Sequence, residues 1–176
     1  MQYLLKVSIE NTPLWRLVAI DGKADISHVA KLIGLAFDYK KSQYCFNIDS
    51  IKISAGVDGQ TSSLEELKTF DSLSLTAGDV FGFVNETQGS LNHKVEVMKA
   101  EDRLYCLIPS CLVGAGILPP EDNLTADAIS AYYDKDDCPS LNLKEVTNRL
   151  REYGSVRKDL EATMSQVSAI PFDIKG

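Results

Sequence analysis

The sequence of 176 residues lacks a long apolar run and any segment typical of an export signal. A membrane-spanning helix needs ~20 predominantly apolar residues, and no stretch approaches that length. The first apolar residues are followed at once by Lys6, which is not the pattern of a signal peptide. We therefore expect a soluble, cytoplasmic protein that does not bind a membrane.

The chain also has few of the residues from which metal and nucleotide sites are built. It has two histidines, His28 and His93, and its four cysteines are widely spaced. A zinc site needs about four ligands at compact spacing, so we expect no metal and no cofactor. The cysteines are expected to be reduced. The segment Gly114-Ala115-Gly116 lacks the further glycine of a phosphate-binding loop, which argues against a nucleotide.

Basic residues are too few for a nucleic-acid-binding surface. The chain has 25 acidic and 18 basic residues, a net charge of -7. Affinity for nucleic acid comes mainly from lysine and arginine, so direct binding is not expected. An acidic surface suits a basic protein partner. The clustered cations are interpreted as solvated faces; they are Lys40, Lys41, Arg149, Arg151, Arg157 and Lys158.

The apolar pattern predicts an α+β fold. Residues 2–10 alternate as a half-buried strand, and residues 14–20 can return beside them as a hairpin. A helix capped by Asp25 carries an apolar stripe from Val29 to Phe37. Further strands are predicted at 44–48, 51–54, within 73–83 and around 95–97, with a short helix from Ser62 or Ser63. A hairpin crossed by one helix predicts a two-layer, ubiquitin-like β-grasp domain.

The C-terminal third has a helical pattern instead. Helices are predicted at 125–133, 142–153 and 155–170, and Asn142 with Glu145 forms a capping box. Their apolar stripes can pack on the sheet, which we favour, or form a partner surface, including that of a homodimer. We therefore divide the chain into an α+β domain at 1–123 and a helical extension at 124–176.

Several separated motifs resemble one known family. They are Pro13-Leu14-Trp15-Arg16, Phe37-Asp38-Tyr39, Cys111 with Gly114, and Pro119-Pro120-Glu121-Asp122. Over about residues 2–123 they resemble the plasmid pRiA4b ORF-3-like family, also known from the MM3350-like domain. Its members are met on plasmids and insertion elements and mostly have no established activity. The resemblance implies a bacterial protein of a mobile element.

The chain departs from the family pattern at its central motif. A family stretch like Tyr-Asp-Phe-Gly-Asp-x-Trp-x-His corresponds here to residues 85–93, where only His93 persists and Leu91 replaces the tryptophan. The helix histidine common in relatives falls at Ala30. If these polar residues form a site in relatives, that site is altered in this chain. We therefore assign no catalytic residue.

The candidate binding residues are Trp15, Arg16, His93, Glu121 and Asp122. In the interpretation we favour, Trp15 is a core residue and Arg16 pairs with Glu121 or Asp122, which fixes the late loop to the hairpin. In the other, Trp15 or Arg16 lines a groove with His93 and Asp122 at its rim. The burial of Trp15 distinguishes the two.

Three functions remain open from the sequence. The first is a non-enzymatic binding or regulatory protein that acts through protein contacts, because no complete catalytic set is evident. The second is a nucleic-acid accessory protein of a transposon or plasmid, against which the net charge argues. The third is a small hydrolase or transferase that uses His93 with an acid.

Overall fold

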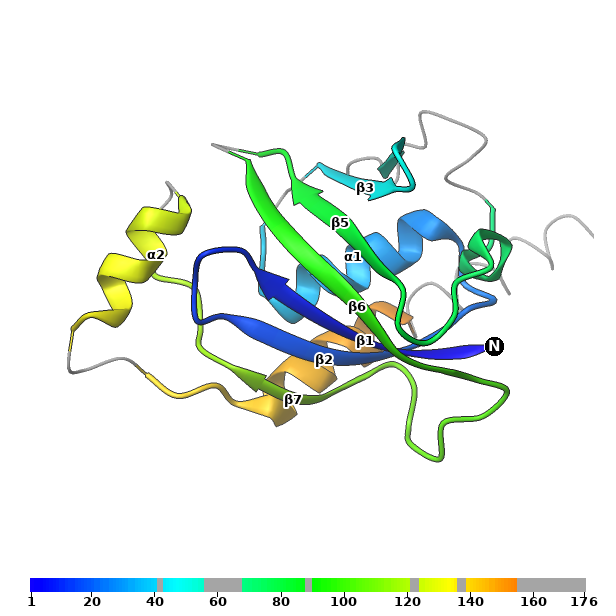
Figure 1. Cartoon of the computed structure of the whole chain (residues 1–176). Coiled ribbons are helices and arrows are strands. Elements are labelled where there is room, and N and C mark those ends of the chain that lie inside the picture. The colour runs from blue at the N-terminus through cyan, green and yellow to red at the C-terminus, as the bar shows by residue number, and fades with distance from the viewer. Residues whose placement is uncertain (41–42, 56–67, 88–89, 121–123, 136–138, 155–176) are drawn as a thin grey trace, which may run out of the picture.

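A seven-stranded antiparallel sheet forms the framework of the protein (Figure 1). The computed structural model describes residues 1–40, 43–55, 68–87, 90–120, 124–135 and 139–154. The strands are β1 (Gln2–Ile9), β2 (Trp15–Asp21), β3 (Tyr44–Ile48), β4 (Ile51–Ala55), β5 (Val80–Asn85), β6 (Leu91–Glu101) and β7 (Ser110–Ala115). They lie in the order β4-β3-β5-β6-β1-β2-β7.

The predicted N-terminal hairpin is confirmed at the centre of this sheet. β1 and β2 pair antiparallel from Gln2 with Asp21 to Ser8 with Trp15, and β6 pairs with the other side of β1. Every second residue of β1, from Tyr3 to Ile9, is buried. The alternation therefore gives the sheet one face that packs on the core and one that faces solvent.

The helix α1 (Ile26–Ala36) covers the inner face of the sheet (Figure 1). Its apolar stripe is buried as predicted, with Val29 and Ile33 fully enclosed. Gly34 allows the helix to approach β3, because a Cβ atom there would lie 2.0 Å from the Tyr44 hydroxyl. α1 ends at Ala36 with Phe37 as its C-cap, so the three residues Phe37 to Tyr39 leave the helix at one end of the sheet.

Two C-terminal helices are present at the predicted places. α2 spans Ala126–Tyr133, and Thr125 caps it by accepting a hydrogen bond from the Ala128 amide. A further helix occupies 143–154. Val146 and Leu150 are buried in the same core as the sheet and α1, so this stripe packs within the chain as we favoured. The division at residue 123 remains a prediction.

Other predictions from the sequence need correction or lie outside the described residues. The segment Phe70–Leu73 is a 3-10 helix, so it is not part of the strand predicted within 73–83; that strand is β5, which begins at Val80 after a turn at residues 77–78. β7 was not predicted. The helices expected from Ser62 or Ser63 and over 155–170 fall outside the described residues.

The α+β class is confirmed by the seven-stranded antiparallel sheet and its helices. The finer β-grasp assignment is not confirmed, since every strand pairing in the sheet is antiparallel and the sheet extends to seven strands. In the described ranges, no helix has the length and apolar character needed to cross a bilayer.

Candidate functional site

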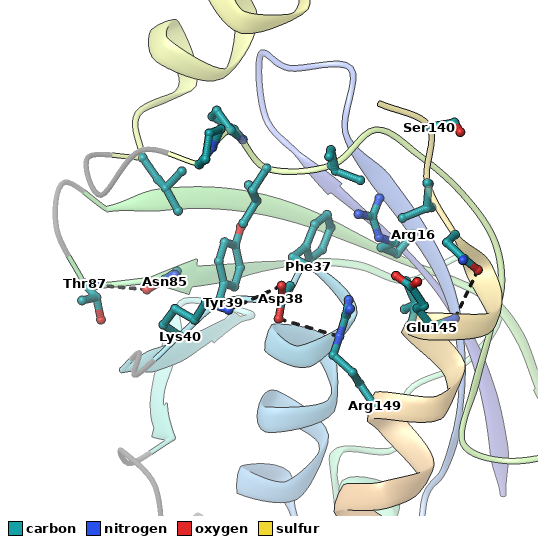
Figure 2. Close-up of a pocket in the computed structure, with 18 residues that line it drawn as sticks. Arg16, Phe37, Asp38, Tyr39, Lys40, Asn85, Thr87, Ser140, Glu145 and Arg149 are labelled. Atoms are coloured by element: carbon teal, nitrogen blue, oxygen red, sulfur yellow. Dashed lines mark hydrogen bonds and ion pairs between the residues drawn. The ribbon is translucent and has the colours of Figure 1, made fainter. Parts of the chain in front are cut away.

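A pocket of about 660 Å³ opens where α1 ends (Figure 2). Its walls come from β2, the segment 37–40, the end of β5, residues 117–120 and the start of the helix 143–154. The pocket thus lies where segments from both the first and the last parts of the chain meet. The sequence motifs around Arg16, Phe37 and Pro119 all contribute to it.

Arg16 is the buried cation of this pocket. It lies on the inner face of β2 and is only 1% exposed. Its Nε donates to the Ala36 carbonyl over 2.8 Å, Nη1 donates to Trp15 and Ala115, and Nη2 donates to Gly116 over 2.7 Å. Four of its five N–H groups are therefore used to hold the end of α1, β2 and the end of β7 together.

Two neighbours allow a guanidinium to lie at this depth. The Phe37 ring lies 4.8 Å from the Arg16 guanidinium carbon, which is the distance of a cation–π contact. Gly114 has no Cβ; one built there would lie 2.8 Å from the Trp15 carbonyl and 3.0 Å from Arg16 Cδ. Burial, above all, lowers the pKa of Arg16, and the charge of Arg149 adds to that effect. A guanidinium nevertheless remains protonated.

Arg149 brings a second guanidinium from the helix 143–154, which Figure 2 shows directed at the end of α1. Its Nε donates to the Leu35 carbonyl over 3.2 Å and lies 3.8 Å from a carboxylate oxygen of Asp38. The interpretation of Arg149 as part of a solvated face is therefore wrong. Its side chain is 29% exposed because it packs between two helices.

The helix that carries Arg149 is capped at its start and hydrogen-bonded to β7. Asn142 accepts hydrogen bonds from the amides of Lys144 and Glu145, so the predicted cap is confirmed. Thr147 accepts from the Cys111 amide and donates to the Cys111 carbonyl, which fixes the helix to β7. The cap defines the start of the helix, and the Thr147 contacts position the wall of the pocket that bears Glu145 and Arg149.

His93 lies behind the pocket rather than in it. The side chain is 1% exposed, with Nδ1 3.1 Å from the Phe83 carbonyl and Nε2 2.6 Å from the Tyr39 hydroxyl. A carbonyl can only accept, so Nδ1 carries the proton and Nε2 accepts from Tyr39. Burial lowers the pKa of His93 to about 4 and raises that of Tyr39 well above its usual value. The pair is neutral at neutral pH.

Trp15 points to the opposite face of the sheet from Arg16. It is half-buried and not part of the core, so the favoured prediction of a core residue is wrong, and it does not line the pocket either. The ammonium group of Lys6 lies 5.3 Å from the centre of its ring, a cation–π contact across β1 and β2. The structure therefore separates these two candidates, although they are adjacent in the sequence.

The remaining candidates, Glu121 and Asp122, lie outside the described residues, so the predicted pairing of Arg16 with either is not tested. Sequence reasoning did not assign a site role to Asp38, Tyr39 or Arg149. Asp38 and Tyr39 belong to the Phe37-Asp38-Tyr39 motif, and this motif could have indicated that they lie at the site. Arg149 had no such signal, because its position depends on how the C-terminal helix packs.

Comparisons with known proteins agree with the sequence motifs. Residues 1–150 match the sequence profile of the family described as plasmid pRiA4b ORF-3-like protein. A similar solved structure is that of MM3350 from Methanosarcina mazei Go1, a protein of unknown function, with a TM-score of 0.58 and 17% identity. The match covers 83% of this chain and 97% of that chain, and at this identity it shows the fold alone. No curated protein shows significant similarity to the chain.

Proposed function

Since this chain belongs to the plasmid pRiA4b ORF-3-like protein family, a family without an established activity, we propose its function from the pocket. The protein is a non-enzymatic binding module that takes a segment of a partner protein into this pocket. The family description refers to a plasmid reading frame, and we propose that the partner is a protein of such a mobile element.

One observation supports this proposal: the pocket combines charged and apolar walls, and among its described lining residues no serine or threonine hydroxyl is hydrogen-bonded to a general base. Arg16, Arg149 and Asp38 supply charge, and Phe37 and Leu141 are among the apolar walls. No histidine or cysteine is found among its described lining residues. Charged groups that fix orientation beside apolar surface are typical of a binding site.

The state of His93 supports binding over hydrolysis or group transfer. A general base works best with a pKa near the operating pH, whereas burial lowers the pKa of His93 to about 4. Both ring nitrogens already lie within hydrogen-bond distance of Tyr39 and Phe83. His93 therefore orients Tyr39, which forms a pocket wall.

The test is partner capture with a blocked pocket. Ser140 is exposed at the rim, so Ser140→Trp fills the opening without disturbing the core. Met98→Trp, at an exposed position of β6 outside the pocket, is the matched control. Tagged wild type and both variants are used to purify partners from the native host at low and moderate salt, with mass spectrometry of protein and analysis of nucleic acid.

We expect one protein in stoichiometric amount with the wild type and with Met98→Trp, retained at moderate salt and lost with Ser140→Trp. Equal retention by Ser140→Trp would contradict a role for the pocket. Capture of nucleic acid alone, lost as salt rises, would instead support the nucleic-acid accessory function.

A further inference from the structure

The guanidinium of Arg16 is buried, and no acidic partner is found for it among the residues that the structure describes. Within the described residues, no carboxylate oxygen lies within 4.0 Å of a guanidinium nitrogen of Arg16, the limit for an ion pair. Its hydrogen bonds go to neutral carbonyls, and one Nη2–H remains after them. Buried charges are normally paired with a charge of opposite sign. The pocket side of Arg16 therefore favours an anion.

Arg149 provides further donors at the same pocket. Its Nε is used by Leu35 and Asp38, whereas neither terminal nitrogen bonds to any residue that the structure describes. These two nitrogens carry four N–H groups in the planar arrangement that fits a carboxylate. At 29% exposure the group is accessible from the pocket yet partly shielded from water.

The charge around the pocket differs in sign from that of the whole chain. Among the described lining residues, three are cations, Arg16, Lys40 and Arg149, and two are acids, Asp38 and Glu145. Asp38 is already used, since it lies 3.5 Å from Lys40 and 3.8 Å from Arg149. The carboxylate of Glu145, on the helix 143–154, would repel a bound anion. The difference of three cations and two acids is one positive charge, whereas the chain carries -7.

Apolar side chains form part of the remaining walls, together with the polar Asn85, Thr87, Ser140 and Asn142. Leu118, Pro119, Leu124 and Leu141 line the pocket, and the Phe37 ring lies beside Arg16. A ligand that matched this surface would bury an apolar body against these side chains. A small inorganic ion would leave that surface in contact with water.

We infer that the pocket binds a carboxylate carried on an apolar body, with the carboxylate at Arg149 and Arg16. A single negative charge matches the single excess positive charge better than a doubly charged phosphate does. This inference rests on the proposed function, in which a partner segment enters the pocket. In that setting the ligand is the C-terminal carboxylate of a partner protein that ends in an apolar residue; a small free organic acid has the same chemistry, and the experiment distinguishes the two.

The experiment compares charged probes with neutral probes of the same shape. Calorimetric titration uses 2-naphthoate with 2-naphthamide as its neutral match, and the peptide Ala-Ala-Phe with a free C-terminus or a C-terminal amide. Arg149→Ala removes the guanidinium group that is proposed to bind the carboxylate. Arg151→Ala, at an exposed position of the same helix, is the control. Circular dichroism and thermal unfolding verify that both variants are folded.

We expect at least one acid to bind and its amide to bind at least about tenfold more weakly, the change expected for loss of a charge-assisted hydrogen bond. Arg149→Ala should weaken the acid by a similar factor, and Arg151→Ala should not. Binding of the peptide acid assigns the carboxylate to a protein terminus, and binding of 2-naphthoate alone assigns it to a free acid. Equal binding of acid and amide, or no binding of either acid, would overturn the inference.

The chain's own acids are a competing occupant, because Arg16 was predicted to pair with Glu121 or Asp122. The Glu121→Gln/Asp122→Asn variant tests this. If only that variant bound the acids, the site would belong to the chain's own carboxylate and an external ligand would be ruled out. Partner capture that is lost with Ser140→Trp but unchanged with Arg149→Ala would overturn the carboxylate inference and leave the proposed function standing.

Discussion

The Tyr39 hydroxyl donates to His93 Nε2 over 2.6 Å inside the core, which connects a wall of the pocket to the one histidine that persists in the central motif. The Phe37 ring packs against both, with ring centres 5.6 Å from Tyr39 and 5.4 Å from His93. The same Phe37 ring contacts the Arg16 guanidinium. Three sequence motifs therefore meet around one aromatic side chain, and the motif residues at this point support a pocket rather than a catalytic set.

The buried histidine should make stability depend on pH. Burial lowers its pKa to about 4 in the folded protein, against the ordinary value of 6.5 for histidine, so between these pH values the unfolded chain binds a proton that the folded protein does not. Stability from this group is complete above about pH 6.5 and falls as pH is lowered, by about 3 kcal/mol in all. Urea unfolding of wild type and His93→Gln at about pH 7 and about pH 4.5 measures it. We expect the wild type to lose more stability over that range than His93→Gln; equal losses would contradict a neutral buried His93.

Arg16 should be irreplaceable even by lysine. Arg16→Lys keeps the charge but cannot supply four directed N–H groups to the carbonyls of Trp15, Ala36, Ala115 and Gly116. We expect a loss of about 3 kcal/mol in the free energy of unfolding, since buried carbonyls are left without donors. Arg151→Lys, at an exposed position, should change stability little. An unchanged stability for Arg16→Lys would show that these hydrogen bonds do not hold the segments together.

Gly114 should resist a single added methyl group. A Cβ there would lie 2.8 Å from the Trp15 carbonyl and 2.9 Å from Leu141 Cδ2. Gly114→Ala should therefore cost about 1–3 kcal/mol, as overpacking of a core usually does. Gly82→Ala is the control within a strand, since its nearest contact is an ordinary 3.4 Å from Asn47 Cβ. Thermal unfolding of both variants measures the difference. Equal melting temperatures for Gly114→Ala and Gly82→Ala would contradict the close approach of Gly114 in β7 to the Trp15 carbonyl.

Trp15 should be dispensable for binding at the pocket. It lies on the outer face beside Lys6, whereas Arg16 points inward. Trp15→Phe should leave the affinity for a carboxylate probe and the capture of a partner unchanged, while Arg149→Ala lowers both. A loss of either with Trp15→Phe, in a folded protein, would move the binding surface to the outer face of the sheet.

Much of the fold could be predicted from local patterns. The alternation of β1 and the stripe of α1 reflect burial of one face, which a sequence records directly. β7 was missed because Ser110–Ala115 has buried, exposed and half-buried residues without a clean alternation. That strand forms one edge of the sheet, and hydrogen bonds with Arg16 and Thr147 position it.

The site was less predictable, because its residues meet only in the folded chain. Arg16 occupies a core position of β2, where a periodic pattern predicts an apolar residue. Arg149 belongs to a basic segment whose charges suggest exposure, yet its Nε bonds to the Leu35 carbonyl. Neither the depth of Arg16 nor the inward position of Arg149 follows from spacing alone, since they depend on contacts with residues 99 and 114 positions away in sequence.

The central claim is that this pocket is the binding part of the protein. NMR chemical-shift mapping of the backbone amides during titration with 2-naphthoate tests it most directly. The account predicts concentration-dependent shifts in the segment 37–40 and at the start of the helix 143–154, with no comparable shifts in the presence of 2-naphthamide. The Arg149→Ala variant should lose them. Shifts confined to the outer face of the sheet around Trp15, or identical shifts with acid and amide, would contradict the account.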